Sequence, residues 1–249
     1  MPAAEAGARS TEQAGAEPAH DGERLSALAL PPLLATFAFY LLPRAIQASV
    51  AVQFLPQIIA YLCLVGWMTL NRHPIERLGL SRKRLPDGLG LGAAVGLALG
   101  LINSLVITWL VPRLGKDIGF LRDTPHAAVP FYVMVPWFIT VIAVLVEINY
   151  RGFLLGRLYH LLTAPSPSQG REAETLLALL LSVLAFAFDP FMVATFRHLH
   201  WIAVWDGLIW GAIWLRCRNL YATITAHAVE VIILYLTVRW WINHSPGMP

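Results

Sequence analysis

The segment Val146–Leu154 reads Val-Glu-Ile-Asn-Tyr-Arg-Gly-Phe-Leu and ends a long apolar run. It places the carboxylate of Glu147 and the guanidinium of Arg151 in a stretch that is otherwise lipid-soluble. Ionisable groups at membrane depth are costly, so a protein that keeps them usually has a use for them. Residues four apart share one face of a helix and can form an ion pair. The segment therefore predicts a membrane-spanning helix that carries a polar site.

The composition of the whole chain agrees with this setting. Of 249 residues, 57% are hydrophobic and 13% are charged, and the mean hydropathy is +0.61. Such values are typical of a multi-spanning membrane protein rather than a soluble domain. The net charge of +3 comes from basic residues in short loops, where they orient helices. We therefore expect the lipid bilayer as a partner and no binding of nucleic acid.

Apolar runs predict the positions of the helices. A helix needs roughly 20 apolar residues to cross a bilayer. Seven runs are candidates, at about 26–43, 48–70, 88–112, 129–150, 174–193, 199–216 and 219–242. The prediction is an all-α, multi-spanning transmembrane helical bundle of about seven helices over residues 26–242.

The two ends of the chain differ from this domain. Residues 1–25 are rich in Ala, Glu and Gly and lack an apolar face, which predicts a disordered tail. Residues 243–249 form a short C-terminal tail. The loop at 72–84 is the most basic segment, so the positive-inside rule places it in the cytoplasm, together with the N-terminus. We expect an integral membrane protein of a bacterial inner (cytoplasmic) membrane.

Further ionisable residues lie in the later apolar runs. His227 and Glu230 are three positions apart, so they share one helix face, and with Glu147 they suggest a polar site shared between helices. The alternative is that His227 is a hydrogen-bonded core residue. Asp189 and Asp206 are either members of the site or local helix caps. The pair Gly207 and Gly211, spaced by four, predicts close packing of two helices.

Four short motifs follow one another along the chain. They are a basic loop that ends in Leu78–Arg82, then Glu147-x-x-x-Arg151 with Gly152-Phe153-Leu154, then Gly207–Gly211, and then Arg218-Asn219-Leu220 leading into Ala226-His227-Ala228. This ordered set resembles the CAAX-protease and bacteriocin-processing family of intramembrane endopeptidases, also called CPBP or Abi. The resemblance covers residues from about 75 to 235 and implies an α-helical membrane core with a hydrolytic site.

The resemblance also assigns roles to residues. The family motif Glu-Glu-x-x-x-Arg supplies the carboxylate that activates water, and Phe-x-x-x-His and His-x-x-x-Asn supply two imidazoles and an amide. It places the second Glu at Glu147, the Arg at Arg151, the Phe at Phe186 and the third-motif His at His227. The remaining family positions are occupied here by Val146, Pro190 and Val231.

These three departures bear on the chemistry. Peptide hydrolysis needs a base or a metal to activate water, and donors to stabilise the oxyanion. None of the three side chains can serve, but Asp189 and Glu230 each stand one position before a missing group and could substitute for it. His227 is a possible metal ligand, with zinc as the divalent metal to consider, or the site needs no cofactor. The spacing Phe196-x-x-x-His200 offers a further His.

Two functions therefore stay open. In the first, the protein is an intramembrane endopeptidase that cuts a membrane-tethered or lipidated peptide near the cytoplasmic face. Glu147 is then the base, Arg151 organises the site, and His227, Asp189 and Glu230 act as ligands or donors. In the second, the protein is a catalytically inactive pseudo-peptidase that serves as a scaffold or accessory subunit of a larger membrane protein complex.

Overall fold

The structure, a computed structural model, describes residues 23–124, 129–164 and 171–244, and these residues form helices and no strand. This confirms the all-α prediction. The helical segments in chain order are η1 (Ser26–Ala29), α1 (Leu30–Phe39), α2 (Arg44–Gln47), α3 (Val50–Gln53), α4 (Leu55–Leu70), α5 (Pro74–Arg77), η2 (Arg82–Arg84), α6 (Leu85–Leu105), η3 (Val106–Leu110), α7 (Val111–Arg113), η4 (Gly119–Asp123), α9 (Phe131–Val133), η5 (Met134–Val141), α10 (Ile142–Glu147), η6 (Ile148–Leu155), α11 (Gly156–Thr163), α12 (Glu172–Ala187), α13 (Pro190–Phe196), η7 (Arg197–Leu199), α14 (Ile202–Cys217) and α15 (Leu220–His244).

The described helices include candidates for membrane spans. Pro74–Arg113, Phe131–Thr163 and Leu220–Trp241 are long and apolar enough to cross a bilayer by length and composition. A fourth span results if Glu172–Ala187 and Pro190–Leu199, which are bent by 51°, form one broken segment. The predicted runs near the N-terminus give shorter apolar helices, and the run at 199–216 gives the 16-residue α14. The predicted runs are thus helical, but turns and prolines shorten several below a full span.

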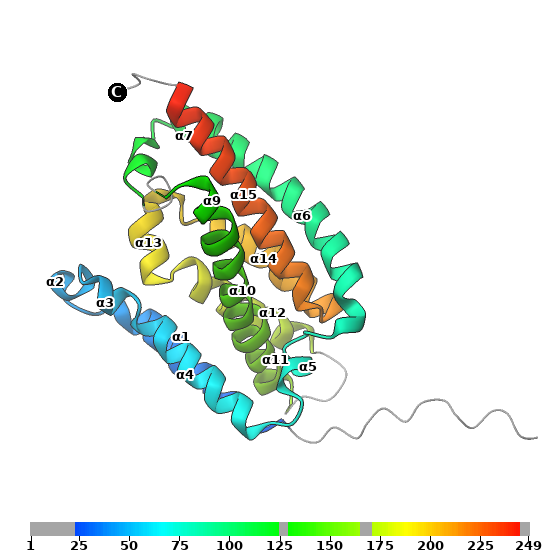
Figure 1. The fold of residues 1–249 in the computed structure, drawn as a ribbon. Helices are drawn as coiled ribbons and strands as arrows, with labels where there is room; N and C mark the ends of the chain where they lie inside the picture. The colour runs from blue at the N-terminus through cyan, green and yellow to red at the C-terminus, as the bar shows by residue number, and fades with distance from the viewer. Residues whose placement is uncertain (1–22, 125–128, 165–170, 245–249) are drawn as a thin grey trace, which may run out of the picture.

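Helices α6 and α15 lie side by side along one side of the bundle (Figure 1). Their backbones approach closely because α6 carries a glycine at every fourth position on the facing side. A Cβ added at Gly92 would lie 2.4 Å from the carbonyl oxygen of Ala222, and one at Gly96 would lie 2.5 Å from that of Ala226. Small residues at this spacing are a common device for helix packing in membranes. The stripe consists of Gly88, Gly92, Gly96 and Gly100.

Helix α14 packs against α12 through the predicted glycine pair. A Cβ at Gly207 would lie 3.2 Å from the side chain of Val183, and one at Gly211 would lie 2.4 Å from that of Leu179. The prediction that this pair brings two helices close together is confirmed. The contact directs the buried face of α14, with Asp206 and Trp210, toward the centre of the bundle.

The long helix Phe131–Thr163 carries the Val146–Leu154 segment. It is π-helical from Met134 to Val141, α-helical from Ile142 to Glu147 and π-helical again from Ile148 to Leu155. Such wide turns are rare and often occur at functional sites. This helix contacts α15 through α10 and α4 through η6, so it lies between the N-terminal helices and the α6–α15 pair (Figure 1). Its buried polar residues therefore point into the protein and not into lipid.

Candidate active site

Glu147, Arg151 and His227 meet inside the bundle. Oε1 of Glu147 lies 2.9 Å from Nη1 of Arg151 and 2.9 Å from Nδ1 of His227. The side chains of Glu147 and Arg151 are 0% and 2% exposed. A buried charge is tolerated only when it is paired and hydrogen-bonded. The ion pair that the four-residue spacing suggested is therefore present. His227, 80 positions away on α15, contacts the same oxygen of Glu147.

Aromatic rings hold the planar groups of this cluster. The ring of His227 stacks on Trp210, with centroids 4.6 Å apart and an interplanar angle of 24°. The guanidinium carbon of Arg151 lies 4.2 Å from the centre of the Phe186 ring and 4.9 Å from that of Trp210. Cations are attracted to aromatic faces. These contacts restrict the orientation of Arg151 and His227, which is what a preorganised site requires.

A second polar cluster joins α6, α14 and α15. Nδ2 of Asn103 lies 3.1 Å from Oδ1 of Asp206 and 2.6 Å from Oε1 of Glu230, and Nε1 of Trp205 donates to Oδ1 of Asn103 over 3.0 Å. The residues Asn103, Asp206 and Glu230 are all buried. Two carboxyl groups thus share one amide donor in the interior. Asp206 lies within α14 and not at its end, so the reading of this residue as a helix cap is wrong.

The two polar clusters belong to one region. Glu230 follows His227 by less than one helical turn, and both Asp206 and Glu230 interact electrostatically with Arg151. Asn103 was not among the site residues predicted from the sequence. The available signal was an amide side chain within the apolar run at 88–112, where a polar group needs a buried partner.

Asp189 caps a helix. It is the N-cap of α13, where Oδ1 accepts a hydrogen bond from the backbone N–H of Met192 over 3.1 Å. The side chains of Gln57 and Tyr150 also donate to its carboxylate, over 3.0 and 3.1 Å. Of the alternatives for Asp189, the structure shows the helix cap.

Tyr40 belongs to the surroundings of Asp189 and lies just after the end of α1. Its hydroxyl donates to the carbonyl oxygen of Phe188 over 2.7 Å. Burial, and to a smaller extent the Asp189 carboxylate, raise the pKa of Tyr40 to about 12. Tyr40 is therefore a neutral hydrogen-bond donor at physiological pH.

Apolar packing accounts for the three residues that depart from the family motifs. Val146 packs against the main hydrophobic core and Val231 against the cluster around Met134 and Tyr235. Pro190 is buried at the first position of α13. None of the three offers a polar atom to the site. His200 has other partners: its Nδ1 atom contacts the carbonyl oxygen of Arg197, and its ring packs against the ring of Phe188.

The donor set does not fit a metal centre. Protein-bound zinc takes at least three His, Cys, Asp or Glu ligands. Within the described ranges, no three such residues are arranged to hold a metal ion. The Nδ1 atom of His227 is already engaged with Glu147.

Two buried atoms of the first cluster have no hydrogen-bond partner among the described residues. They are Oε2 of Glu147 and Nη2 of Arg151. A buried polar atom without a partner is rare in native proteins and calls for an explanation. One atom is an acceptor and the other a charge-bearing donor, and they belong to residues one turn apart. An acceptor for the proton of water and a donor for an oxyanion are what amide hydrolysis needs.

Comparison with known proteins gives one match. Residues 128–233 match the family model described as Type II CAAX prenyl endopeptidase Rce1-like. The matched range includes Glu147, Arg151 and His227. It begins after α6, so it does not include Asn103. No curated protein and no solved structure matches the chain.

Proposed function

We propose that this integral membrane protein, whose residues 128–233 match the Rce1-like family model, is an intramembrane endopeptidase whose hydrolytic centre consists of Glu147, Arg151 and His227. The single observation that carries the proposal is the joint burial of an acceptor, Oε2 of Glu147, and a donor, Nη2 of Arg151, that lack partners in the described part of the chain.

Each residue has a defined role in the proposed reaction. Oε2 of Glu147 takes a proton from water as the water oxygen bonds to the scissile carbonyl carbon. The carbonyl oxygen becomes an oxyanion, which Nη2 of Arg151 stabilises. Glu147 then passes the proton to the amide nitrogen as the C–N bond breaks. Nδ1–H of His227 donates to Oε1 and so keeps the other oxygen of Glu147 directed at the water.

The location of the cluster suggests the class of substrate. Glu147 and Arg151 lie on a helix long enough to span the bilayer, and His227 lies on another. A peptide must therefore reach the site from within the membrane or from its surface. We propose a membrane-tethered or lipidated peptide, cut near the cytoplasmic face, with the basic loop at 72–84 and the N-terminus in the cytoplasm. A bacterial inner membrane is the proposed location.

The test is cleavage of a panel of membrane-tethered peptides by the purified protein in liposomes. Wild type is compared with His227→Ala, and the products are identified by mass spectrometry. Glu172→Gln is the matched control, because Glu172 is an exposed acid in the first turn of α12. Cleavage by wild type and by the control, with loss in His227→Ala, supports the proposal. Equal cleavage by wild type and both variants contradicts it.

A second candidate function rests on a different observation. Oε1 of Glu147 accepts from two cationic or polar groups at once, and Val146, Pro190 and Val231 supply no catalytic atom. A site neutralised in this way also suits a catalytically inactive scaffold or accessory subunit. That function predicts no cleavage of any peptide in the panel, together with recovery of the same membrane proteins by wild type and by Glu147→Gln.

A further inference from the structure

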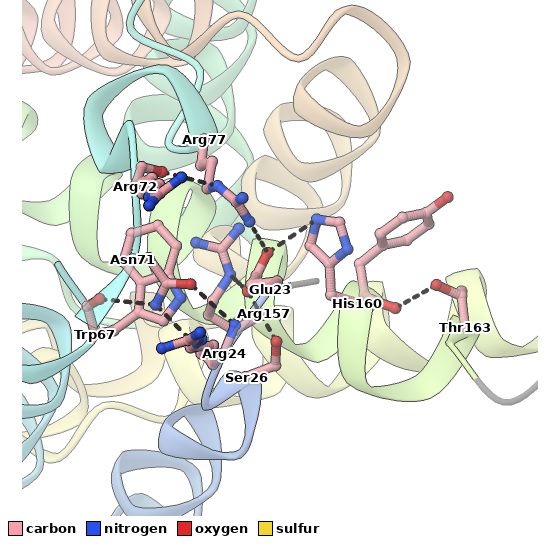
Figure 2. A network of polar contacts seen from close by, with 11 residues as sticks. Glu23, Arg24, Ser26, Trp67, Asn71, Arg72, Arg77, Arg157, His160 and Thr163 are labelled. Carbon is pink, nitrogen blue, oxygen red and sulfur yellow. Dashed lines mark hydrogen bonds and ion pairs between the residues drawn. The ribbon is translucent and has the colours of Figure 1, made fainter. Parts of the chain in front are cut away.

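A second buried ionic network lies at the end of the bundle where α1 begins, around the carboxylate of Glu23 (Figure 2). Oε1 of Glu23 lies 2.5 Å from Nε of Arg157 and accepts from the hydroxyl of Ser26 over 2.8 Å. Oε2 lies 3.2 Å from Nε2 of His160 and 3.9 Å from Nη1 of Arg77. The carboxylate is only 7% exposed. Glu23, just before the first helix, thus contacts two guanidinium groups and one imidazole from α5 and α11.

Positive charge exceeds negative charge in this network. Arg157 interacts electrostatically with both Arg77 and Arg218, while Glu23 is the acid that these residues share. Burial lowers the pKa of Arg218, whose guanidinium carbon lies 4.2 Å from the centre of the Tyr159 ring. Three guanidinium groups therefore gather around one carboxylate. Buried cations are stable only when they are matched by anions or other acceptors.

Arg157 shows where an acceptor is missing. Its side chain is fully buried and its guanidinium carbon lies 3.9 Å from the centre of the Trp67 ring. Within residues 23–124, 129–164 and 171–244, its Nη1 and Nη2 atoms have no hydrogen-bond partner. Two charged donors are thus left unpaired in a fully buried position. The Glu23 carboxylate therefore does not pair every donor of Arg157.

We propose that Arg77, Arg157 and His160 form a binding site for a phosphate-bearing anion, which Glu23 occupies with its own carboxylate in the ligand-free protein. A phosphate monoester has three terminal oxygens and carries more charge than a carboxylate. Arginine guanidinium groups bind it in a bidentate manner. It would supply acceptors for the Nη1 and Nη2 atoms of Arg157 that Glu23 leaves unpaired.

Two sources offer this chemistry. One is the headgroup of an anionic lipid, because basic sites at the membrane end of helices bind such headgroups. The other is a free phosphate in the adjoining solution. Both would compete with the Glu23 carboxylate for the same guanidinium groups. Removal of the negative charge of Glu23 should therefore strengthen the binding of either anion.

The test measures anion binding by the full chain in phosphatidylcholine nanodiscs. Inorganic phosphate is titrated by calorimetry in one arm, and in the other arm phosphatidic acid is added to the nanodiscs and the thermal unfolding midpoint is followed. Glu23→Gln removes the competing charge at equal size, so affinity should rise by about tenfold or more, the value of one charge-assisted hydrogen bond. A response to phosphatidic acid alone identifies a lipid headgroup, and a response to inorganic phosphate identifies a free anion.

Partly exposed members of the network supply variants that spare the core. Arg77→Gln and His160→Gln should weaken binding by about tenfold each. Lys83→Gln is the matched control, since Lys83 is an exposed cation of the same basic loop. The proposal is overturned if neither wild type nor Glu23→Gln binds either probe, or if Lys83→Gln weakens binding as much as Arg77→Gln. This readout does not depend on peptide cleavage, so it can fail while the proposed function holds.

Discussion

Nδ1 of His227 lies 2.9 Å from Oε1 of Glu147, although 80 positions separate the two residues. The contact links α15 to the end of α10, and the stacking of His227 on Trp210 adds α14 to the same site. Three helices thus determine the position of one carboxylate.

The buried ion pair between Glu147 and Arg151 should be strongly coupled. Removal of one partner leaves an uncompensated charge in the interior, so Glu147→Gln and Arg151→Gln should each lower the free energy of unfolding by about 3–5 kcal/mol. The double variant should lose less than the sum of the two losses, because neither charge is then left unpaired. Unfolding of the purified variants in mixed micelles measures all three values. Additive losses would show that the pair does not act as a unit.

The shared amide of Asn103 predicts opposite effects for two conservative substitutions. Glu230→Gln removes one of two carboxyl groups that share a donor and keeps an acceptor for Asn103, so the free energy of unfolding at neutral pH should stay the same or rise. Asn103→Asp replaces the donor by a third acid and should lower it by about 3–5 kcal/mol. The same unfolding measurement compares them. A loss in Glu230→Gln as large as that in Asn103→Asp would exclude this account of the cluster.

Asp189 should matter for stability and not for catalysis. Loss of an N-cap costs about 0.5–2 kcal/mol, and Asp189→Ala also leaves the donors of Gln57 and Tyr150 without their acceptor. Asp189→Asn keeps an acceptor oxygen and should be milder. Both variants should retain peptide cleavage at temperatures where they are folded. If Asp189→Asn loses as much activity as Glu147→Gln, Asp189 belongs to the catalytic set.

Local spacing predicted part of this site and could not predict the rest. Glu147 with Arg151, and His227 with Glu230, are close in sequence, so helical periodicity alone places each pair on one face. The contact of His227 with Glu147 was suggested by family resemblance and by the cost of buried charge. Asn103 could not be assigned a partner, because its contacts with Asp206 and Glu230 depend on how α6 packs on α14 and α15.

Other elements show the same limit. The run at 199–216 ends within one residue of α14, but the length of the run at 174–193 did not show that it holds two helices, α12 and α13, bent by 51°. Residues 1–25 were predicted to be a disordered tail, and most of that segment lies outside the described residues. Its last part includes Glu23, whose role depends on Arg157 and His160, more than 130 positions away. A polar segment with no apolar face gives no local signal of such a contact.

The glycine stripe of α6 should tolerate no added methyl group at Gly92. The new Cβ would lie 2.4 Å from the backbone oxygen of Ala222, which cannot move without shifting α15. Gly92→Ala should lower the free energy of unfolding by about 1–3 kcal/mol or more. Gly90→Ala is the matched control, because nothing lies within 4 Å of its Cβ position, and alanine should favour the helix by up to about 1 kcal/mol. Equal effects of the two variants would contradict the close contact of α6 and α15.

The most direct test of the hydrolytic centre is the rate constant for peptide cleavage by Glu147→Gln in proteoliposomes, at a temperature where this variant and Glu172→Gln are both folded. Loss of a positioned base lowers the rate on the order of 10²–10⁴-fold, so Glu147→Gln should fall by that amount while Glu172→Gln cleaves like wild type. Cleavage by folded Glu147→Gln at the wild-type rate would contradict the assignment of Glu147 as the base.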